Sequence, residues 1–209
     1  MSAVDRGVLF VVSGPSGVGK STLLQHCLDT FPDLAFSVSA TTRAPRVGET
    51  DGVDYHFVQR ERFEALIAGD AFIEHATVYD HSYGTLRETT DDAIRSGQSL
   101  ILDIDVQGAA QVRTQMPEAV HIMVLPPNLE VLERRLRARG TDSDAVINRR
   151  MAQVTEQLQA CGQFDYLVIN DVLSVAQRTF NGIFDAEFSR RSRRSSVVAA
   201  VSGWAMNRG

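Results

Sequence analysis

Cysteine and long hydrophobic runs are scarce in this 209-residue chain, and each shortage excludes a kind of protein. The two cysteines, Cys27 and Cys161, have no CxxC or Cys/His spacing, so a cysteine-based metal site is not expected. We expect both to be buried thiols within helices. No run of about 18 apolar residues is present, so we expect no membrane association. The short apolar N-terminal run lacks a cleavable small-residue site, and the expected location is the cytoplasm.

The chain also lacks an excess of positive charge. It has 21 lysine and arginine residues against 26 aspartate and glutamate residues, a net charge of −5. Because phosphate backbones are bound through a basic excess, we expect no nucleic-acid partner. The five histidines share no metal-ligand spacing. An anionic ligand must therefore be bound by a local group of residues, in a composition that is typical of a soluble globular protein.

Short apolar runs alternate with helix-like segments along most of the chain. The run "GVLFVVSG" ends in glycine and is followed by the amphipathic segment "KSTLLQHCLDTF". From Ser99 onward, "SLILDID", "VHIMVL" and "YLVIN" each precede another helical pattern. Strands that alternate with helices predict an α/β fold, in which a parallel sheet is flanked by helices on both sides.

The alternation breaks in two places, which we interpret as inserts in one core. Residues 39–87 contain short β-like segments around the helical segment "RERFEALIAGD", and residues 135–150 indicate a charged turn between two helices. The core then comprises residues 1–38, 88–134 and 151–187. Residues 188–209 form a tail rich in arginine and serine. We expect this tail to be loosely ordered or to support a homo-oligomer. Its arginines are expected to lie at a solvated helix end, and contact with acidic surfaces is the alternative.

The segment "GPSGVGKST" fits the pattern GxxxxGK[ST] between an apolar strand and a helix. Glycines let consecutive backbone N–H groups turn inward around phosphate oxygens, and the helix N-terminus adds its positive dipole end. We expect Lys20 to reach the β and γ phosphates of ATP and the Ser21 hydroxyl to coordinate Mg²⁺. A merely structural glycine-rich turn is the alternative. The expected ATP-binding residues here are Gly14, Pro15, Ser16, Gly17, Val18, Gly19, Lys20, Ser21 and Thr22.

Two aspartates, Asp103 and Asp105, end the apolar strand "SLILDID". The carboxyl edge of a parallel sheet faces its ligand crevice, and alternation along the strand would place both on one face. Either could orient Mg²⁺ through water or accept from a substrate. For Asp105 a helix-capping role is an equal alternative.

A polar loop carries a second candidate anion site. Arg43 and Arg46 lie three residues apart, and their planar guanidinium groups match phosphate oxygens. Pairing of both arginines with Glu49 and Asp51 in a solvated loop is the alternative. A second anion site beside a P-loop suggests phosphoryl transfer to a phosphorylated acceptor. The expected ligands of the acceptor phosphate are Arg43, Arg46, Tyr55 and Tyr83.

Arginines in the second insert suit a lid over ATP. Arg135 and Arg139 are spaced i,i+4 on one helix face, and Arg150 follows the predicted turn. A lid that closes would bring these cations to the transferred group and exclude water. The alternative is an exposed helix end with salt bridges. We expect Lys20, Arg135, Arg139 and Arg150 to be the catalytic cations.

Taken together, these motifs resemble the guanylate kinase family. The resemblance rests on "GPSGVGKST", "TTRAPRVGETDGVDYHF", "FIEHATVYDHSYGT", "LILDIDVQG" and "RLRARGTDSDAVINRR", in the order and spacing of the family, and covers Val8 to Glu187. It implies a P-loop kinase fold with a GMP-binding insert and an ATP lid. The implied reaction transfers the γ-phosphoryl group of ATP to GMP or dGMP, with Mg²⁺.

The resemblance also implies contacts with the two bases. It places guanine contacts on Ser39, Glu74, Thr85 and Asp103, and an adenine contact on Asn170. The chemistry agrees for Glu74, because a carboxylate accepts both N1–H and the N2 amine of guanine, whereas adenine presents an acceptor there. Whether Asp103 serves guanine, Mg²⁺ through water, or both stays open. Without the resemblance, Glu74 would be interpreted as an exposed strand residue.

Two other function classes remain as alternatives. One is a noncatalytic module of guanylate-kinase type that binds protein ligands, although the P-loop lysine and lid arginines are present here. The other is a P-loop kinase for a different phosphorylated acceptor. A GTP-hydrolysing switch is disfavoured because the chain has no NKxD-like guanine motif.

Overall fold

The computed structural model of the chain describes residues 5–78, 80–138 and 144–206. A parallel five-stranded sheet forms the core, in the order β2-β7-β1-β8-β9. This confirms the predicted α/β class with a parallel sheet. The strands are β1 (Leu9–Ser13), β2 (Leu34–Phe36), β7 (Ser99–Asp103), β8 (Val120–Leu125) and β9 (Tyr166–Ile169).

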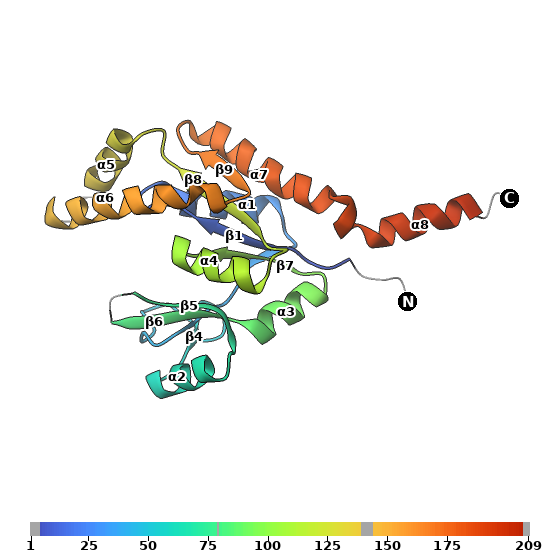
Figure 1. The fold of residues 1–209 in the computed structure, drawn as a ribbon, viewed down its shortest axis with the longest axis horizontal. Coiled ribbons are helices and arrows are strands. Elements are labelled where there is room, and N and C mark those ends of the chain that lie inside the picture. Colours follow the sequence, from blue (N-terminus) through green and yellow to red (C-terminus); the bar gives the residue numbers. More distant parts are fainter. Residues whose placement is uncertain (1–4, 79, 139–143, 207–209) are drawn as a thin grey trace.

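Helices cover both faces of this sheet (Figure 1). Successive strand residues point to opposite faces, so β1 supplies two separate hydrophobic clusters. Phe10 and Val12 pack with residues of α1 (Lys20–Thr30) and α7 (Leu173–Ser189). Leu9 and Val11 pack with residues of α3 (Arg87–Arg95) and α4 (Val106–Gln115). Burial on both faces explains why β1 is an uninterrupted apolar run.

The first insert forms a second, mixed sheet below the core in Figure 1. Its strand order is β4-β3-β6-β5, and only β3 and β4 pair in parallel. The segment "LAFSVSA", residues 34–40, has the sequence character of one strand but contributes to two, because β2 joins the core sheet and β3 joins this second sheet. The elements are β3 (Ala40–Thr41), β4 (His56–Phe57), α2 (Arg60–Ala68), β5 (Phe72–Val78) and β6 (His81–Leu86).

The second insert is more helical than the sequence suggested. Helix α5 spans Leu129–Ala138 and α6 spans Asp144–Gln159, followed by the 3₁₀ turn η1 (Ala160–Gln163). The expected charged turn over residues 135–150 is therefore wrong for every described residue in that range. Both helices extend into this range because Leu136 and Ile147 are buried in the hydrophobic core. Arg139 lies outside the described residues.

The C-terminal tail also differs from the expectation of loose order. It contains the 3₁₀ turn η2 (Arg191–Arg193) and helix α8 (Ser195–Met206), which projects away from the core in Figure 1. The start of α8 is fixed because Asp5 Oδ1 accepts hydrogen bonds from Ser195 Oγ and from the Ser196 backbone N–H. Within the described ranges, no helix is long and apolar enough to cross a bilayer.

Two smaller expectations need correction. Cys27 is fully buried, and burial raises the pKa of its thiol to about 12, but Cys161 in η1 is only half-buried. Arg193 does not lie at a solvated helix end. Its side chain is 17% exposed and its Nη2 is 3.1 Å from Oε2 of the buried Glu187.

Candidate active site

The loop between β1 and α1 contains positions whose backbone conformation and surroundings only glycine accommodates. Gly14 and Gly19 have φ angles of 148° and 97°. A Cβ at Gly14 would lie 2.3 Å from the carbonyl oxygen of Val124, and one at Gly19 would lie 2.4 Å from Nδ2 of Asn170. Gly19 is also the N-cap of α1 and supplies no capping side chain, so the first amides of this helix can serve a ligand.

Lys20 and Asp103 meet where β1 and β7 end. Lys20 Nζ donates to the Gly14 carbonyl at 2.8 Å and lies 3.8 Å from Asp103 Oδ1. Burial raises the pKa of Asp103, and Lys20 opposes that shift. The expectation that Asp103 and Asp105 share a strand face is wrong, because β7 ends at Asp103. Asp105 instead caps α4 by accepting from the Gly108 N–H at 2.8 Å.

Asn170 follows β9 and is buried beneath the P-loop. Its Nδ2 donates to the Val18 carbonyl at 2.8 Å, and its own carbonyl accepts from Arg135 Nη1 at 2.9 Å. Arg150 of α6 reaches the same loop, with Nη1 3.3 Å from Ser16 Oγ. The structure thus brings Arg135 and Arg150 to the P-loop. Arg137, which the sequence did not single out, forms surface ion pairs with Glu133 and Asp144.

The second sheet buries one carboxylate. Glu74 of β5 is 5% exposed and pairs in the sheet with Thr85 of β6, which is fully buried. The Thr85 hydroxyl donates to Glu74 Oε1 at 2.7 Å. Burial raises the pKa of Glu74, only partly offset by this hydrogen bond. Glu74 is therefore a buried carboxylate, and no lysine or arginine is among the described groups that shift its pKa.

Glu74 also faces the core across the first turn of α4. A Cβ at Gly108 would lie 2.9 Å from Glu74 Oε2, so the helix approaches the carboxylate closely only because position 108 is glycine. The nearby charge of Asp105 further raises the pKa of Glu74. Since Asp103 and Asp105 bracket the turn from β7 into α4, one short segment borders both Lys20 and Glu74.

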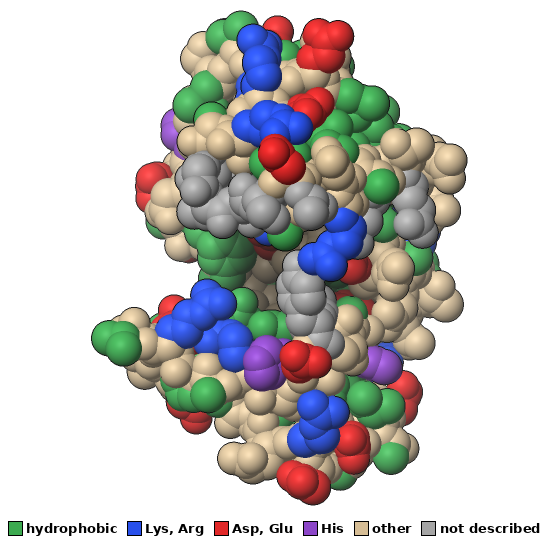
Figure 2. All heavy atoms as spheres, turned by 90° about the vertical axis from the view of Figure 1, so that its left-hand side faces the viewer, with side chains coloured by type: hydrophobic (Ala, Val, Ile, Leu, Met, Phe, Trp, Pro, Cys, Tyr) green, Lys and Arg blue, Asp and Glu red, His purple; other side chains and the backbone are tan. Residues whose placement is uncertain are grey.

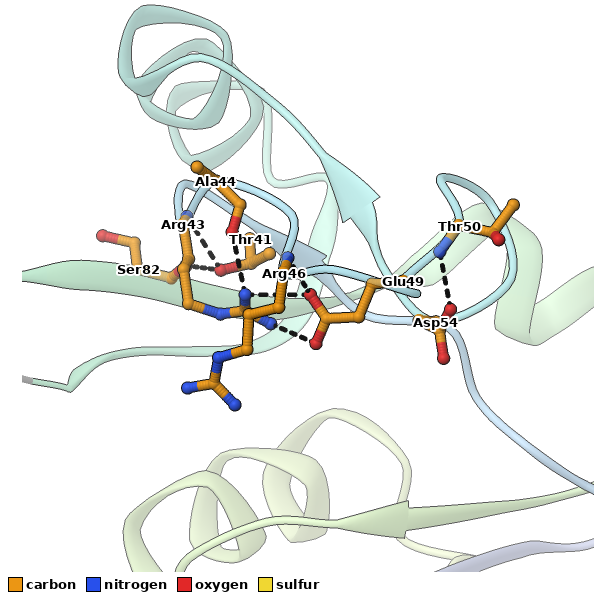
Figure 3. A network of polar contacts seen from close by, with 8 residues as sticks. All are labelled: Thr41, Arg43, Ala44, Arg46, Glu49, Thr50, Asp54 and Ser82. Carbon is orange, nitrogen blue, oxygen red and sulfur yellow. Dashed lines mark hydrogen bonds and ion pairs between the residues drawn. The ribbon is translucent and has the colours of Figure 1, made fainter.

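The polar loop after β3 is organised around Glu49 (Figure 3). Its carboxylate accepts from Arg43 Nη1 at 2.9 Å and Nη2 at 2.8 Å, and from the Arg46 backbone N–H at 2.7 Å. The guanidinium of Arg46 points away from Glu49 in this view. Asp51 does not pair with the arginines but accepts from the Phe57 N–H. The alternative of internal pairing thus holds for Arg43 alone.

Tyr55 and Tyr83 lie beside Arg43. The guanidinium carbon is 5.4 Å from the centre of the Tyr55 ring, and the two tyrosine rings are 6.0 Å apart. Burial raises the pKa of Tyr55. The pKa of Arg43 is raised chiefly by its hydrogen bond to Glu49, with a contribution from Tyr83. Three of the expected phosphate ligands therefore converge.

Figure 2 shows the side of the molecule on which core and insert face each other. A hollow separates the upper part from the insert below, and basic side chains lie on both margins. Ser39 leads into β3 and is half-buried, with its carbonyl accepting from the His56 N–H at 2.9 Å. The arrangement offers two polar sites joined by the end of β7.

The protein groups available for a metal are few. Within the described ranges, no three His, Cys, Asp or Glu side chains are grouped to hold a metal ion. Mg²⁺ that accompanies nucleotide phosphates usually keeps several waters and needs only one or two protein oxygens. Ser21 is exposed in the first turn of α1, so its hydroxyl fits that requirement.

Sequence reasoning did not single out Gly108 or the burial of Glu74. The only local signal for Gly108 is a glycine in the first turn of a helix, a position where glycine costs stability. The partners of Glu74 are distant in sequence and meet only through pairing of β5 with β6 and packing of α4. In the structure Asn170 Nδ2 donates to the Val18 carbonyl of the P-loop, and the expected contact of Asn170 with adenine stays a prediction.

Comparison with known proteins gives similarities to guanylate kinases. The family described as guanylate kinase matches residues 6–187. The guanylate kinase of Carboxydothermus hydrogenoformans is 46% identical over 200 residues, 96% of this chain and 98% of that protein. The guanylate kinase of Syntrophotalea carbinolica is 48% identical over 196 residues, 94% and 93% of the two chains. A crystal structure of guanylate kinase from Anaplasma phagocytophilum has a TM-score of 0.69 at 32% identity and covers 92% of each chain.

Proposed function

This chain belongs to the guanylate kinase family and is an ATP:GMP phosphotransferase, and from that premise we propose how its residues divide the work. In the reaction a GMP phosphate oxygen attacks the γ-phosphorus of ATP, the bond from that phosphorus to the β-γ bridging oxygen breaks, and ADP leaves. Such a transfer needs little covalent participation by the protein, so the residues act by positioning and charge stabilisation.

The donor site is the P-loop, Gly14 to Thr22. Its backbone amides and the N-terminus of α1 bind the ATP phosphates. Lys20, which lies 2.8 Å from the Gly14 carbonyl, turns outward to the β and γ phosphates. Mg²⁺ would be held by Ser21, and when bound it supplies positive charge at the transferred group. Asn170 supports this site by holding the Val18 carbonyl in place.

The acceptor phosphate is bound in the insert. Arg46 and Arg43 supply the charge, and the hydroxyls of Tyr55 and Tyr83 complete the site. The convergence of Arg43 with both tyrosines in the structure supports this assignment. Arg46 remains available because only its backbone N–H is bonded to Glu49.

The guanine base is read by the buried pair of Glu74 and Thr85. Ionised Glu74 accepts N1–H and the N2 amine, and Thr85 fixes the carboxylate by donating to Oε1. Ser39 contributes a hydroxyl, and Asp103 serves guanine, Mg²⁺ through water, or both. Adenine in this site would set an acceptor against the carboxylate, at a cost of about 1–3 kcal/mol for each unpaired buried group. The buried Glu74 is the observation that carries the choice of guanine.

Residues 135–150 act as the lid and residues 39–87 as the GMP-binding insert, on a core of residues 1–38, 88–134 and 151–187. Closure brings Arg135, Arg139 and Arg150 to the transferred group and excludes water. The hydrogen bonds of Arg135 to the Asn170 carbonyl and of Arg150 to Ser16 support this role for two of the three.

We also propose a cytoplasmic location, because ATP and GMP are cytoplasmic metabolites. The net charge of −5 disfavours nucleic acid as a partner. Helix α8 has no charged residue, and Val197, Val198 and Val201 on it are exposed. This composition favours self-association, in which α8 packs against α8 of a second copy of the chain. Sedimentation of the full-length protein and of a variant without α8 would test this.

The reaction is tested by measuring ADP release with ATP, Mg²⁺ and each of GMP, dGMP, AMP, UMP and CMP. We expect turnover with GMP and dGMP and at least about 100-fold lower kcat/KM with AMP, since two mismatched groups each cost about tenfold. Equal rates with AMP and GMP would overturn the assignment of Glu74. No turnover with any monophosphate would favour a noncatalytic binding module.

A further inference from the structure

Glu49 occupies one edge of the Arg43 guanidinium. A guanidinium group has five N–H donors in a fixed planar arrangement. Two of them on Nη1 point to Ala44 O at 2.8 Å and Glu49 Oε2 at 2.9 Å, and one on Nη2 points to Glu49 Oε1 at 2.8 Å. These contacts use the terminal edge of the group. The Nε–H and the second Nη2–H lie together on the other edge, which matches two oxygens of a phosphate.

Glu49 also fixes the backbone of the loop that carries both arginines. Its carboxylate accepts from the Arg46 N–H at 2.7 Å, while its own N–H donates to the Arg46 carbonyl at 3.1 Å. This closes the turn at Gly48, whose φ is 93°. As Figure 3 shows, one carboxylate thereby sets the direction of the Arg43 guanidinium and the start of the Arg46 side chain.

The aromatic side chains restrict Arg43 further. Its guanidinium carbon is 5.4 Å from the Tyr55 ring centre and 5.7 Å from the Phe57 ring centre. Hydrogen bonding to Arg43 lowers the pKa of Glu49, so the carboxylate is ionised at neutral pH. The side chains of Arg43 and Glu49 are only 11% and 20% exposed. A pair this enclosed has little freedom to reorganise when a ligand arrives.

We propose that Glu49 is a positioning residue of the acceptor-phosphate site, which presents the Nε–Nη2 edge of Arg43 to the phosphate of GMP. The proposal rests on the function assigned to Arg43 and Arg46. It assigns Glu49 a favourable role in binding even though its charge repels the phosphate. The opposite role, a placeholder that the phosphate must displace, predicts the opposite change on mutation.

The test is the KM for GMP and for ATP of Glu49→Gln, together with the inhibition constant of guanosine, which has the base but no phosphate. We expect the KM for GMP to rise about 10-fold or more, because a hydrogen bond to a charged group is replaced by a neutral one. The KM for ATP and the inhibition constant of guanosine should change less than about twofold. An unchanged guanosine constant also shows that the insert is folded.

Asp54→Asn is the matched control. Asp54 lies in the same loop and accepts from the Thr50 N–H at 2.7 Å, so this change removes one nearby negative charge without touching Arg43. A double-mutant cycle then asks whether Glu49 acts through Arg43. In Arg43→Ala protein, Glu49→Gln should add less than about twofold to the KM for GMP.

Three results would overturn the proposal: a lower KM for GMP in Glu49→Gln, an equal rise in Asp54→Asn, or a full additional effect in Arg43→Ala protein. Each leaves the proposed function intact as long as the unmodified protein phosphorylates GMP. Failure of the unmodified protein to use GMP would instead refute the function from which the proposal starts.

Discussion

At the scale of single residues, the proposed recognition of guanine depends on a carboxylate that the fold buries before any ligand arrives. Glu74 is 5% exposed, and its partner Thr85 is neutral. Burial of an ion without a countercharge costs stability, and the raised pKa of Glu74 expresses that cost. A base with two adjacent N–H donors would satisfy the carboxylate. The proposed selectivity for guanine therefore rests on a buried carboxylate whose hydrogen-bond partner in the ligand-free protein, Thr85, carries no charge.

The raised pKa gives a pH dependence with a defined sign. In the proposed site only ionised Glu74 accepts both donors of guanine, so the KM for GMP should rise as pH falls through the raised pKa, above the ordinary value of 4.5. For folding the sign is reversed: the native state binds the proton more readily than the unfolded state, so this group's contribution to stability falls as pH rises.

Glu74→Gln separates these two effects. The variant should lose the GMP-specific pH dependence and should use AMP at a rate closer to its rate with GMP. Without ligand at pH 7 its Tm should exceed that of the unmodified protein by about 2–4 °C if roughly 1 kcal/mol is recovered. Steady-state kinetics and thermal unfolding between pH 5 and pH 8 are the measurements. An unchanged pH profile in the variant would exclude Glu74 as the titrating group.

Gly108 permits the close approach of α4 to Glu74. In Gly108→Ala the new Cβ would lie 2.9 Å from Glu74 Oε2, so the carboxylate must move. We expect the KM for GMP to rise about 10-fold, comparable to loss of one charged hydrogen bond. The KM for ATP should stay within about twofold. Gly182→Ala in α7 is a suitable control, since its added Cβ would have no atom within 4 Å apart from the adjacent residues and the nearby backbone of its own helix.

Some residues of the site could be predicted from sequence and others could not. The P-loop and the Arg43–Arg46 pair depend on short-range spacing, which a sequence displays directly. The burial of Glu74 depends on a cross-strand partner and on a helix from the core. Glu49 was visible as a candidate partner of the arginines, but its two hydrogen bonds to Arg43 are a property of the folded loop.

At the scale of elements, residues at the C-terminal end of β9 and in α5 hold the P-loop in place through hydrogen bonds. Asn170, directly after β9, joins the Val18 carbonyl to Arg135 of α5. Gly19 cannot be replaced by a larger residue without displacing the Asn170 amide, because that amide occupies the space next to the missing Cβ of Gly19. The proposed donor site therefore depends on three segments that are far apart in sequence.

Asn170→Ala should weaken this support. The buried Val18 carbonyl would lose its donor, and we expect the KM for ATP to rise about 10-fold while the KM for GMP changes less than about twofold. Asn181→Ala is the matched control, because Asn181 makes an exposed side-chain bond to Thr30. Equal effects of both variants on ATP would count against a specific role for Asn170.

The elements of the core could be predicted because strands buried on both faces are continuous apolar runs. The same reasoning failed where tertiary packing decided. The segment "LAFSVSA" divides between two sheets, and no local signal marks that division. Helices α5 and α6 extend into the expected turn because Leu136 and Ile147 are buried in the core. The charged residues around them in the sequence made the apolar periodicity of these helices difficult to recognise.

At the scale of the whole molecule, the account requires two sites on opposite sides of one hollow (Figure 2). The donor site belongs to the core and the acceptor site to the insert, and the turn from β7 into α4 borders both. Lys20 Nζ lies 3.8 Å from Asp103 Oδ1. Gly108, which faces Glu74, follows Asp103 by only a few residues in the chain. Bound nucleotides at the two sites would approach each other across this turn.

The most direct test of separate sites is equilibrium binding of GMP, and of ATP with Mg²⁺, to Arg46→Ala measured by titration calorimetry. Arg46 is exposed, and its guanidinium points away from the Glu49 carboxylate in Figure 3, so its removal should leave the loop intact. The account predicts that the Kd for GMP rises about 10- to 100-fold, as for loss of a charged hydrogen-bonding group, while the Kd for ATP changes less than about twofold. An equal rise in both constants would contradict it.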